Sequence, residues 1–290
     1  MSSISEAARW HAVSPDGTRL GVFESGQGPP LLLVHGSLGD HTRWDVLRAY
    51  LEPNVTVFAM DRRGRGASTD APVYAAEREY EDVAAVIDAI AQRTGQPVTV
   101  YGHSYGGLCA FGAAALTSNL GRLALYEGWP PPDPEPFEPS PDLRQHVETL
   151  FDAGDVDEAL KLILREVVGM TDQEIATYRA DPSWSGRVAA ASTFLREEAA
   201  FAKAVWSPQA AARIGVRTLI LTGDQTPSWR SHADEVVEAL PDARRVVLTG
   251  QGHSADITAP ASVAAALRAF LGSDEHASET DPAAKAASVR

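Results

Sequence analysis

Residues 98–108, VTVYGHSYGGL, join a run of apolar and β-branched residues to a run of small ones, and Ser104 stands at the junction. Gly102 and Gly106 flank this serine, two residues away on either side. Glycines at these positions let a strand turn at once into a helix, because the two elements approach closely and the turn is strained. The segment therefore predicts a strand, a sharp turn and a helix, with the Ser104 hydroxyl exposed at the carboxyl end of the strand.

The rest of the chain alternates β-like runs with helical patterns. The first two runs, 9–13 and 20–25, flank the turn sequence SPDGT and predict a hairpin. Six further runs are expected as strands at 31–35, 55–60, 98–101, 123–126, 217–222 and 245–248. Apolar residues at helical spacing lie between them, which indicates an α/β fold with a mostly parallel, eight-stranded sheet covered on both faces.

One long insertion interrupts this alternation. Residues 129–142 are rich in proline, and residues 142–212 show only helical patterns. We expect a core of residues 1–128 and 213–272, a helical cap of residues 129–212 and a disordered tail of residues 273–290. The insertion begins at a strand end, where open α/β sheets bind ligands. We therefore expect its tryptophans Trp129, Trp184 and Trp206 to line a substrate pocket.

Composition narrows the classes of function. The formal net charge of −14 argues against a nucleic-acid groove and against binding to anionic lipid. One cysteine, no apolar stretch of membrane-spanning length and a polar N-terminus favour a cytoplasmic protein. Metal-ligand clusters and nucleotide-binding glycine motifs are not found in the sequence, so we expect no cofactor. The expected partner is a small-molecule substrate, and the expected state is a monomer or a simple homodimer.

A serine hydroxyl becomes a good nucleophile only when a base takes its proton. His253 is the best candidate, because it lies in a glycine-rich loop after the last predicted strand. The oxyanion of an acyl transfer needs two backbone N–H donors. Tyr105, at the start of the helix after Ser104, is expected to supply one and Ser37 the other, with Leu38 beside it in the pocket.

The motifs LLLVHGSLGD, FAMDRRGRGAS, VYGHSYGG, LILTGDQTP and LTGQGHSA occur in this order over residues 20–272. In this the chain resembles the α/β-hydrolase superfamily, in its capped, esterase-like branch. The resemblance implies the eight-stranded fold, the inserted cap and a catalytic triad. It also implies that DRRGRG, residues 61–66, is a structural loop.

The triad acid departs from the family pattern. The family usually places an aspartate three residues after the glycine that ends the strand following the cap, and here that position is Thr226. Asp224 is the carboxylate in that loop, and Glu127 follows the strand before the cap, where some relatives place their acid. We favour Glu127, because its longer side chain suits the more distant strand, and keep Asp224 as the alternative.

These features predict a serine hydrolase that cleaves a carboxylic ester, lactone or thioester of a small apolar molecule through an acyl-enzyme. Carbon–carbon hydrolases, lyases and cyclases use the same fold, so they are the alternative within it. A non-hydrolytic small-molecule binder is the alternative from another class, although a pure binder has no need of a paired serine and histidine.

Overall fold

The computed structural model describes residues 8–131, 140–182, 184–204 and 206–272, and the side chains of residues 227–231 are left out of the description. The expected tail at 273–290 and part of the proline-rich stretch lie outside these ranges. Within them, eight strands form one sheet of order β1-β2-β4-β3-β5-β6-β7-β8. The strands are β1 (Ala8–Val13), β2 (Arg19–Gly26), β3 (Pro30–Val34), β4 (Thr56–Met60), β5 (Val98–His103), β6 (Leu120–Tyr126), β7 (Arg217–Gly223) and β8 (Ala243–Leu248). Only β1–β2 and β2–β4 pair antiparallel among these strands, so the predicted mostly parallel sheet is confirmed.

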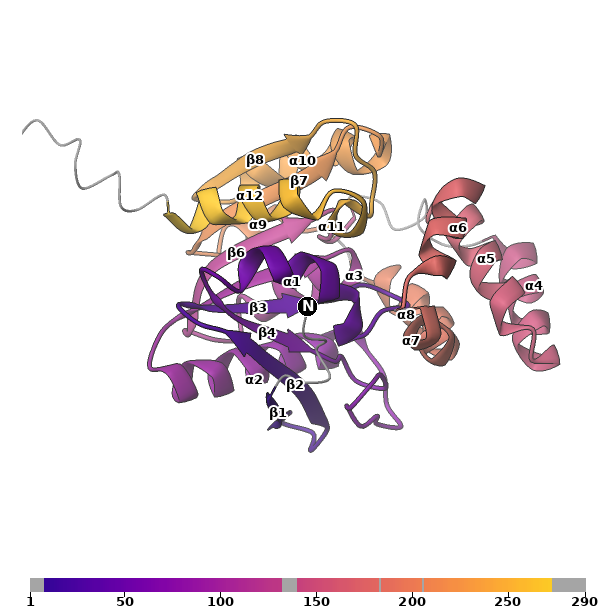
Figure 1. Ribbon diagram of the computed structural model, residues 1–290, viewed down its shortest axis with the longest axis horizontal. Helices are drawn as coiled ribbons and strands as arrows, with labels where there is room; N and C mark the ends of the chain where they lie inside the picture. Colours follow the sequence, from indigo (N-terminus) through magenta and orange to yellow (C-terminus); the bar gives the residue numbers. More distant parts are fainter. Residues whose placement is uncertain (1–7, 132–139, 183, 205, 273–290) are drawn as a thin grey trace, which may run out of the picture.

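Helices cover both faces of the sheet (Figure 1). One face packs against α1 (Asp45–Leu51) and α12 (Pro260–Leu271), with buried side chains such as Leu47 and Leu267. The other packs against α2 (Ala76–Thr94), α3 (Tyr105–Ala113) and α10 (Pro227–Ala239). Short elements complete the core: η2 (His41–Trp44), α9 (Pro208–Ala211) and α11 (Ala255–Thr258). One apolar layer on each face of the sheet therefore buries the central strands and fixes their positions.

Helix α3 lies close to the sheet because its second and third residues, Gly106 and Gly107, have no side chain. A side-chain carbon added at Gly106 would lie 2.3 Å from the carbonyl oxygen of Val34 on β3. One added at Gly107 would lie 2.5 Å from the carbonyl oxygen of Gly128. Such approaches exclude any larger residue. The glycines that follow Ser104 thus fix the position of this helix and of the turn before it.

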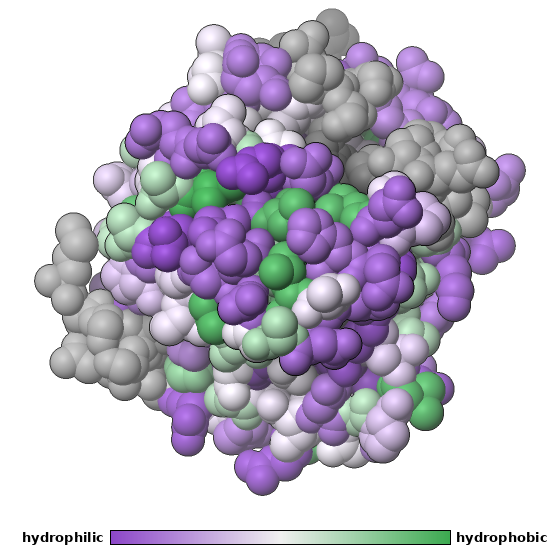
Figure 2. Space-filling model, turned by 90° about the vertical axis from the view of Figure 1, so that its right-hand side faces the viewer, coloured by the Kyte–Doolittle hydropathy of each residue, from purple (hydrophilic) through white to green (hydrophobic). Residues whose placement is uncertain are grey.

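The inserted helices lie between β6 and β7 and have a small apolar core of their own. They are α4 (Pro141–Ala153), α5 (Val156–Glu166), α6 (Asp172–Ala180), α7 (Trp184–Ala190), η4 (Ala191–Thr193) and α8 (Phe194–Phe201). Leu160, Ile163 and Phe194 are among the residues buried in that core. Figure 1 shows these helices grouped at one end of the molecule, toward which the arrow of β6 points. Figure 2 faces that end and shows a largely hydrophilic surface in which hydrophobic residues emerge in small patches. Among the described residues, none of the helices is long and apolar enough to cross a membrane.

The inserted helices are fastened to the core by buried ion pairs. Glu197 on α8 accepts hydrogen bonds from Arg62 and Arg65, which follow β4. Arg62 also pairs with Glu79 on α2 at 2.7 Å, and these side chains are fully buried. Burial acts to raise the pKa of Glu79, but the charge and hydrogen bonds of Arg62 outweigh it and lower that pKa. The arginines of the DRRGRG loop therefore serve a structural role.

Candidate active site

Ser104 occupies the strained turn that its flanking glycines predict. Its backbone has φ 53° and ψ −130°, a conformation that non-glycine residues rarely adopt. The Ser104 N–H donates to the Tyr126 carbonyl oxygen on β6 at 3.0 Å, and its own carbonyl accepts from the Gly107 N–H at 2.8 Å. The turn is thus held on both sides, and it presents the serine to a cavity at the carboxyl end of β5.

His253 also lines this cavity and is paired with a buried carboxylate. Its Nδ1 lies 2.7 Å from Oε2 of Glu127, whose side chain is fully buried. A carboxylate can only accept, so Nδ1 carries the proton, and in the neutral ring Nε2 is left with its lone pair. This arrangement leaves His253 able to act as a base through Nε2.

The second oxygen of Glu127 is held by the loop after β7. Oε1 accepts from the Gly223 N–H at 2.8 Å and from the Thr226 hydroxyl. Glu127 itself follows the last residue of β6 and has φ 45°, a left-handed conformation that non-glycine residues rarely adopt. Asp224 accepts from the Gly250 N–H and the Gln225 amide at 2.8 Å each. Glu127 is therefore a carboxylate hydrogen-bonded to the imidazole, and Thr226 binds the same carboxylate.

The loop that bears His253 is anchored by side chains of two central strands. Tyr126 at the end of β6 donates its hydroxyl to the Gly252 carbonyl oxygen. His103 at the end of β5 lies with Nε2 2.6 Å from the His253 carbonyl oxygen. Burial first, and the charge of Arg43 second, lower the pKa of His103 well below its usual value, so its ring is neutral and donates through Nε2. His103 thus positions the backbone of His253.

The two residues expected to supply the oxyanion donors both line the cavity that contains Ser104. Tyr105 is the first residue of α3, where backbone N–H groups have no acceptor within the helix. Ser37 follows β3, and both residues line the cavity. The His35 ring fixes that second loop, since Nδ1 lies 2.9 Å from the Gly36 carbonyl oxygen and Nε2 lies 3.2 Å from the Arg62 nitrogen. Both expected oxyanion donors therefore border the same cavity as the serine.

The cavity has a volume of about 600 Å³, a size typical of sites for small molecules. Apolar side chains of the inserted helices form much of its wall, and Leu38 also lines it. Three tryptophans do not, so that expectation was wrong. Trp129 and Trp206 are buried in the core beside α3, and Trp184 packs in the core of the inserted helices, its Nε1 3.2 Å from Asp157. Each supports the fold, and none is among the residues around the cavity.

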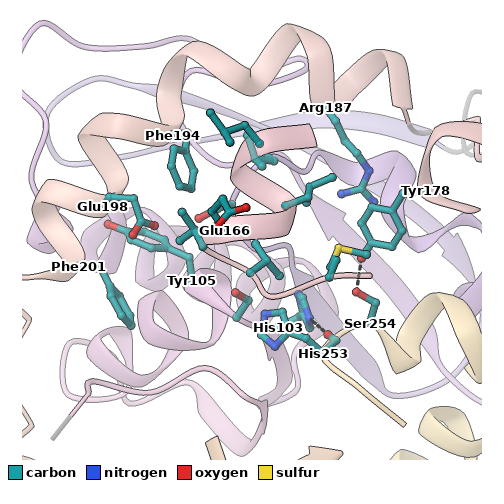
Figure 3. Close-up of a pocket in the computed structure, with 18 of the residues that line it drawn as sticks. His103, Tyr105, Glu166, Tyr178, Arg187, Phe194, Glu198, Phe201, His253 and Ser254 are labelled. Atoms are coloured by element: carbon teal, nitrogen blue, oxygen red, sulfur yellow. Dashed lines mark hydrogen bonds between the residues drawn. The ribbon is translucent and has the colours of Figure 1, made fainter. Parts of the chain in front are cut away.

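Several polar residues of the cavity were not predicted from the sequence. Arg43 pairs with Asp256 at 2.6 Å and donates to the Tyr178 hydroxyl, which also contacts the Ser254 hydroxyl. Arg187 on α7 lies over the Tyr178 ring at 4.2 Å. Figure 3 shows Arg187 and Tyr178 on one side of the cavity, with His103, His253 and Ser254 below them. No local motif marks these residues, because arginines and tyrosines on helices are common at any surface.

On the opposite side, Figure 3 shows Glu198, Phe201 and Tyr105. Glu198 is 8% exposed and is another residue that the sequence analysis did not single out. Its spacing from Phe194 and Phe201 on α8 is helical and would place all three on one face. The two sides of the cavity therefore differ in charge, with a guanidinium on one and a carboxyl on the other.

A sequence model of the alpha/beta hydrolase family matches residues 31–266 of the chain. A curated relative from Acinetobacter baylyi, an (E)-2-((N-methylformamido)methylene)succinate hydrolase, is 26% identical over 256 residues, 86% of this chain and 92% of its own. An alpha/beta hydrolase from Sphaerobacter thermophilus is 34% identical, with a TM-score of 0.76 over 90% of this chain and all of its own. A thermophilic esterase from Thermogutta terrifontis is 25% identical, with a TM-score of 0.68 over 91% and 98%. The chain is an enzyme and belongs to the alpha/beta hydrolase family.

Proposed function

We propose that the enzyme is a serine hydrolase that cleaves a carboxylic ester, lactone or thioester of a small, largely apolar molecule. The hydrogen bond of 2.7 Å between His253 Nδ1 and Glu127, at a cavity shared with the strained Ser104, is the observation on which this proposal rests. The similarity to an esterase supports the same reaction class.

In the proposed mechanism, Nε2 of His253 takes the proton of the Ser104 hydroxyl as Oγ attacks the substrate carbonyl. The backbone N–H groups of Ser37 and Tyr105 hold the negative oxygen of the tetrahedral intermediate. The imidazolium then gives its proton to the departing alcohol or thiol, which leaves an acyl-serine. Glu127 stabilises this imidazolium and keeps the ring in one tautomer.

Water completes the cycle. His253 takes a proton from water, the resulting hydroxide attacks the acyl-serine, and the second tetrahedral intermediate uses the same two N–H donors. Collapse releases the carboxylic acid and returns the proton to Ser104. In the whole cycle, one ester and one water molecule are consumed, and one acid and one alcohol or thiol are formed. This stoichiometry requires no cofactor.

We further propose that the inserted helices act as a cap that selects the substrate. Val167, Met170 and Phe194 are among their apolar side chains around the cavity, and they suit an apolar substrate body. The buried ion pairs of Glu197 with Arg62 and Arg65 would hold such a cap in a fixed position on the core.

A carboxylate on the substrate would find a partner at the Arg187 side. Arg187 is 2% exposed and lines the cavity together with Arg43. The relative from Acinetobacter baylyi acts on a succinate derivative, which supports a second candidate function: hydrolysis of a substrate that bears a carboxylate. Guanidinium groups bind carboxylates strongly when water is excluded.

Intact-mass measurement after treatment with a fluorophosphonate tests the proposal. We expect one adduct on the wild-type enzyme and none on Ser104→Ala, together with turnover of a p-nitrophenyl ester by the wild type alone. An adduct that persists in the folded Ser104→Ala variant would contradict the assignment of the nucleophile. Folded wild-type protein that forms no adduct and cleaves no ester would instead favour lyase, cyclase or binding roles.

A further inference from the structure

Helix α8 presents two adjacent carboxyl groups to different surroundings. Glu197 meets Arg62 and Arg65 of the core and is fully buried. Glu198 lines the cavity instead, between Phe194 and Phe201 of the same helix. Glu197 therefore attaches the helix to the core, whereas Glu198 faces the cavity in which a substrate would bind.

Glu198 is 8% exposed, and its carboxyl lies at the cavity without a hydrogen bond to another described residue. Its immediate wall is apolar and aromatic, with Phe201 and Tyr105 at a ring separation of 6.0 Å. Burying a polar group without a hydrogen bond costs free energy, so such groups are normally satisfied by a partner or a ligand. A substrate that reached this side of the cavity would supply the missing partner.

The charged and titratable groups around Glu198 decide its protonation. Glu197 stands next to it on α8, Arg144 approaches from α4, and Glu166 and Tyr105 line the cavity from α5 and α3. Burial, and after it the negative charge of Glu197, raise the pKa of Glu198 to about 8, against a smaller opposing effect of Arg144. At neutral pH the group is therefore a carboxylic acid, with one O–H donor and one carbonyl acceptor.

Resting on the proposed hydrolase function, we propose that Glu198 is a specificity-determining residue that binds an uncharged hydrogen-bonding group of the substrate, such as a carboxamide or a hydroxyl, on the side of the cavity opposite Arg187. The pattern of one donor and one acceptor matches a carboxamide in two hydrogen bonds. An ammonium group would demand an ionised partner, which the apolar wall disfavours, and a methyl group would leave the carboxyl unsatisfied.

The test compares two series of esters that are matched in length and end in carboxamide, in its isostere isopropyl, or in ammonium. The first series consists of p-nitrophenyl esters with the terminal group on the acyl chain, and the second of acetate esters with the terminal group on the alcohol. In one of the two series we expect the wild type to prefer carboxamide over isopropyl by about tenfold in kcat/KM, the value of one good hydrogen bond. Glu198→Gln should keep this preference, since its amide also donates and accepts, and Glu198→Leu should lose it. Glu158→Gln, on the exposed face of α5, is the control for substitution of a glutamate outside the cavity.

Two results would overturn the proposal: an equal carboxamide preference in wild type and Glu198→Leu, or a preference of the wild type for ammonium. If Glu198→Leu does not fold, pH supplies the comparison. The wild-type preference should weaken above pH 8 as Glu198 ionises, while that of Glu198→Gln should stay constant. A wild-type preference that did not change with pH would equally contradict it. Fluorophosphonate labelling of the wild type separates this outcome from failure of the hydrolase function, because it reports Ser104 without any terminal group.

Discussion

Glu127 bridges His253 and the loop after β7, because one oxygen lies 2.7 Å from Nδ1 of the histidine and the other accepts from the Gly223 N–H and the Thr226 hydroxyl. Strands β5, β6 and β7 are parallel neighbours, so their carboxyl ends meet at one edge of the sheet. A carboxylate on β6 can therefore reach a histidine that arrives from the far end of the chain, while the loop after β7 contributes a hydroxyl that orients it.

The first prediction concerns this acid. Glu127→Gln should slow fluorophosphonate labelling of Ser104 by about 10³- to 10⁴-fold, because an amide no longer fixes the tautomer or stabilises the imidazolium. Asp224→Asn should label at nearly the wild-type rate, since Asp224 bonds to Gly250 and Gln225. A large loss in Asp224→Asn with none in Glu127→Gln would contradict the assignment.

The sheet could be predicted because each strand has a local pattern that tertiary structure merely completes. All eight expected strands are present, and the largest change is an earlier start of β6, at Leu120 rather than residue 123. Ser104 and His253 could be proposed from the sequence for the same reason, since a glycine-flanked turn and a glycine-rich loop after a strand are local features.

The residues that line the cavity could not be predicted in this way. A tryptophan in a helical insertion gains as much by packing in a core as by facing a ligand, and Trp129 and Trp206 pack beside α3. Glu198 and Arg187 look like solvated residues in the sequence, because only the packing of the inserted helices against the core buries them. Their roles depend on tertiary contacts that no local pattern encodes.

The adjacent carboxyls of α8 provide a matched pair for stability. Glu197→Gln leaves Arg62 and Arg65 with less negative charge in a fully buried cluster, and breaking such a pair costs on the order of 3 kcal/mol of unfolding free energy. Glu198→Gln should not destabilise the protein at neutral pH, because it replaces a neutral acid of the folded state by a neutral amide and removes the cost of keeping that acid protonated. Urea unfolding of both variants measures the difference, and equal destabilisation would show that Glu197 does not anchor the helix as described.

The pH dependence of stability gives a third prediction. A carboxyl whose pKa rises from 4.5 in the unfolded chain to about 8 in the folded one favours folding most below 4.5, where both states hold the proton. Between these values only the unfolded state releases it, so this contribution falls as pH rises and is lost above about 8. Glu198→Gln does not titrate there, and its stability relative to the wild type should rise across this window by on the order of 5 kcal/mol. Thermal melts of the two proteins at matched pH would show a constant gap if Glu198 were solvated.

The last prediction concerns Arg187 and tests whether the substrate bears a carboxylate. Its guanidinium lines the cavity beside Tyr178, and burial, partly opposed by Tyr178 and reinforced by Arg43, lowers its pKa. Such a poorly hydrated cation gains most from an anionic ligand, so Arg187→Gln should raise KM for a carboxylate-bearing ester by about tenfold or more while kcat changes less. The same variant should change KM for a neutral ester of equal length only slightly, and Ser104 should still be labelled by the fluorophosphonate. If KM rose equally for both esters, Arg187 would support the wall of the cavity rather than bind an anion, and the succinate-like class of substrate would lose its physical basis in this enzyme.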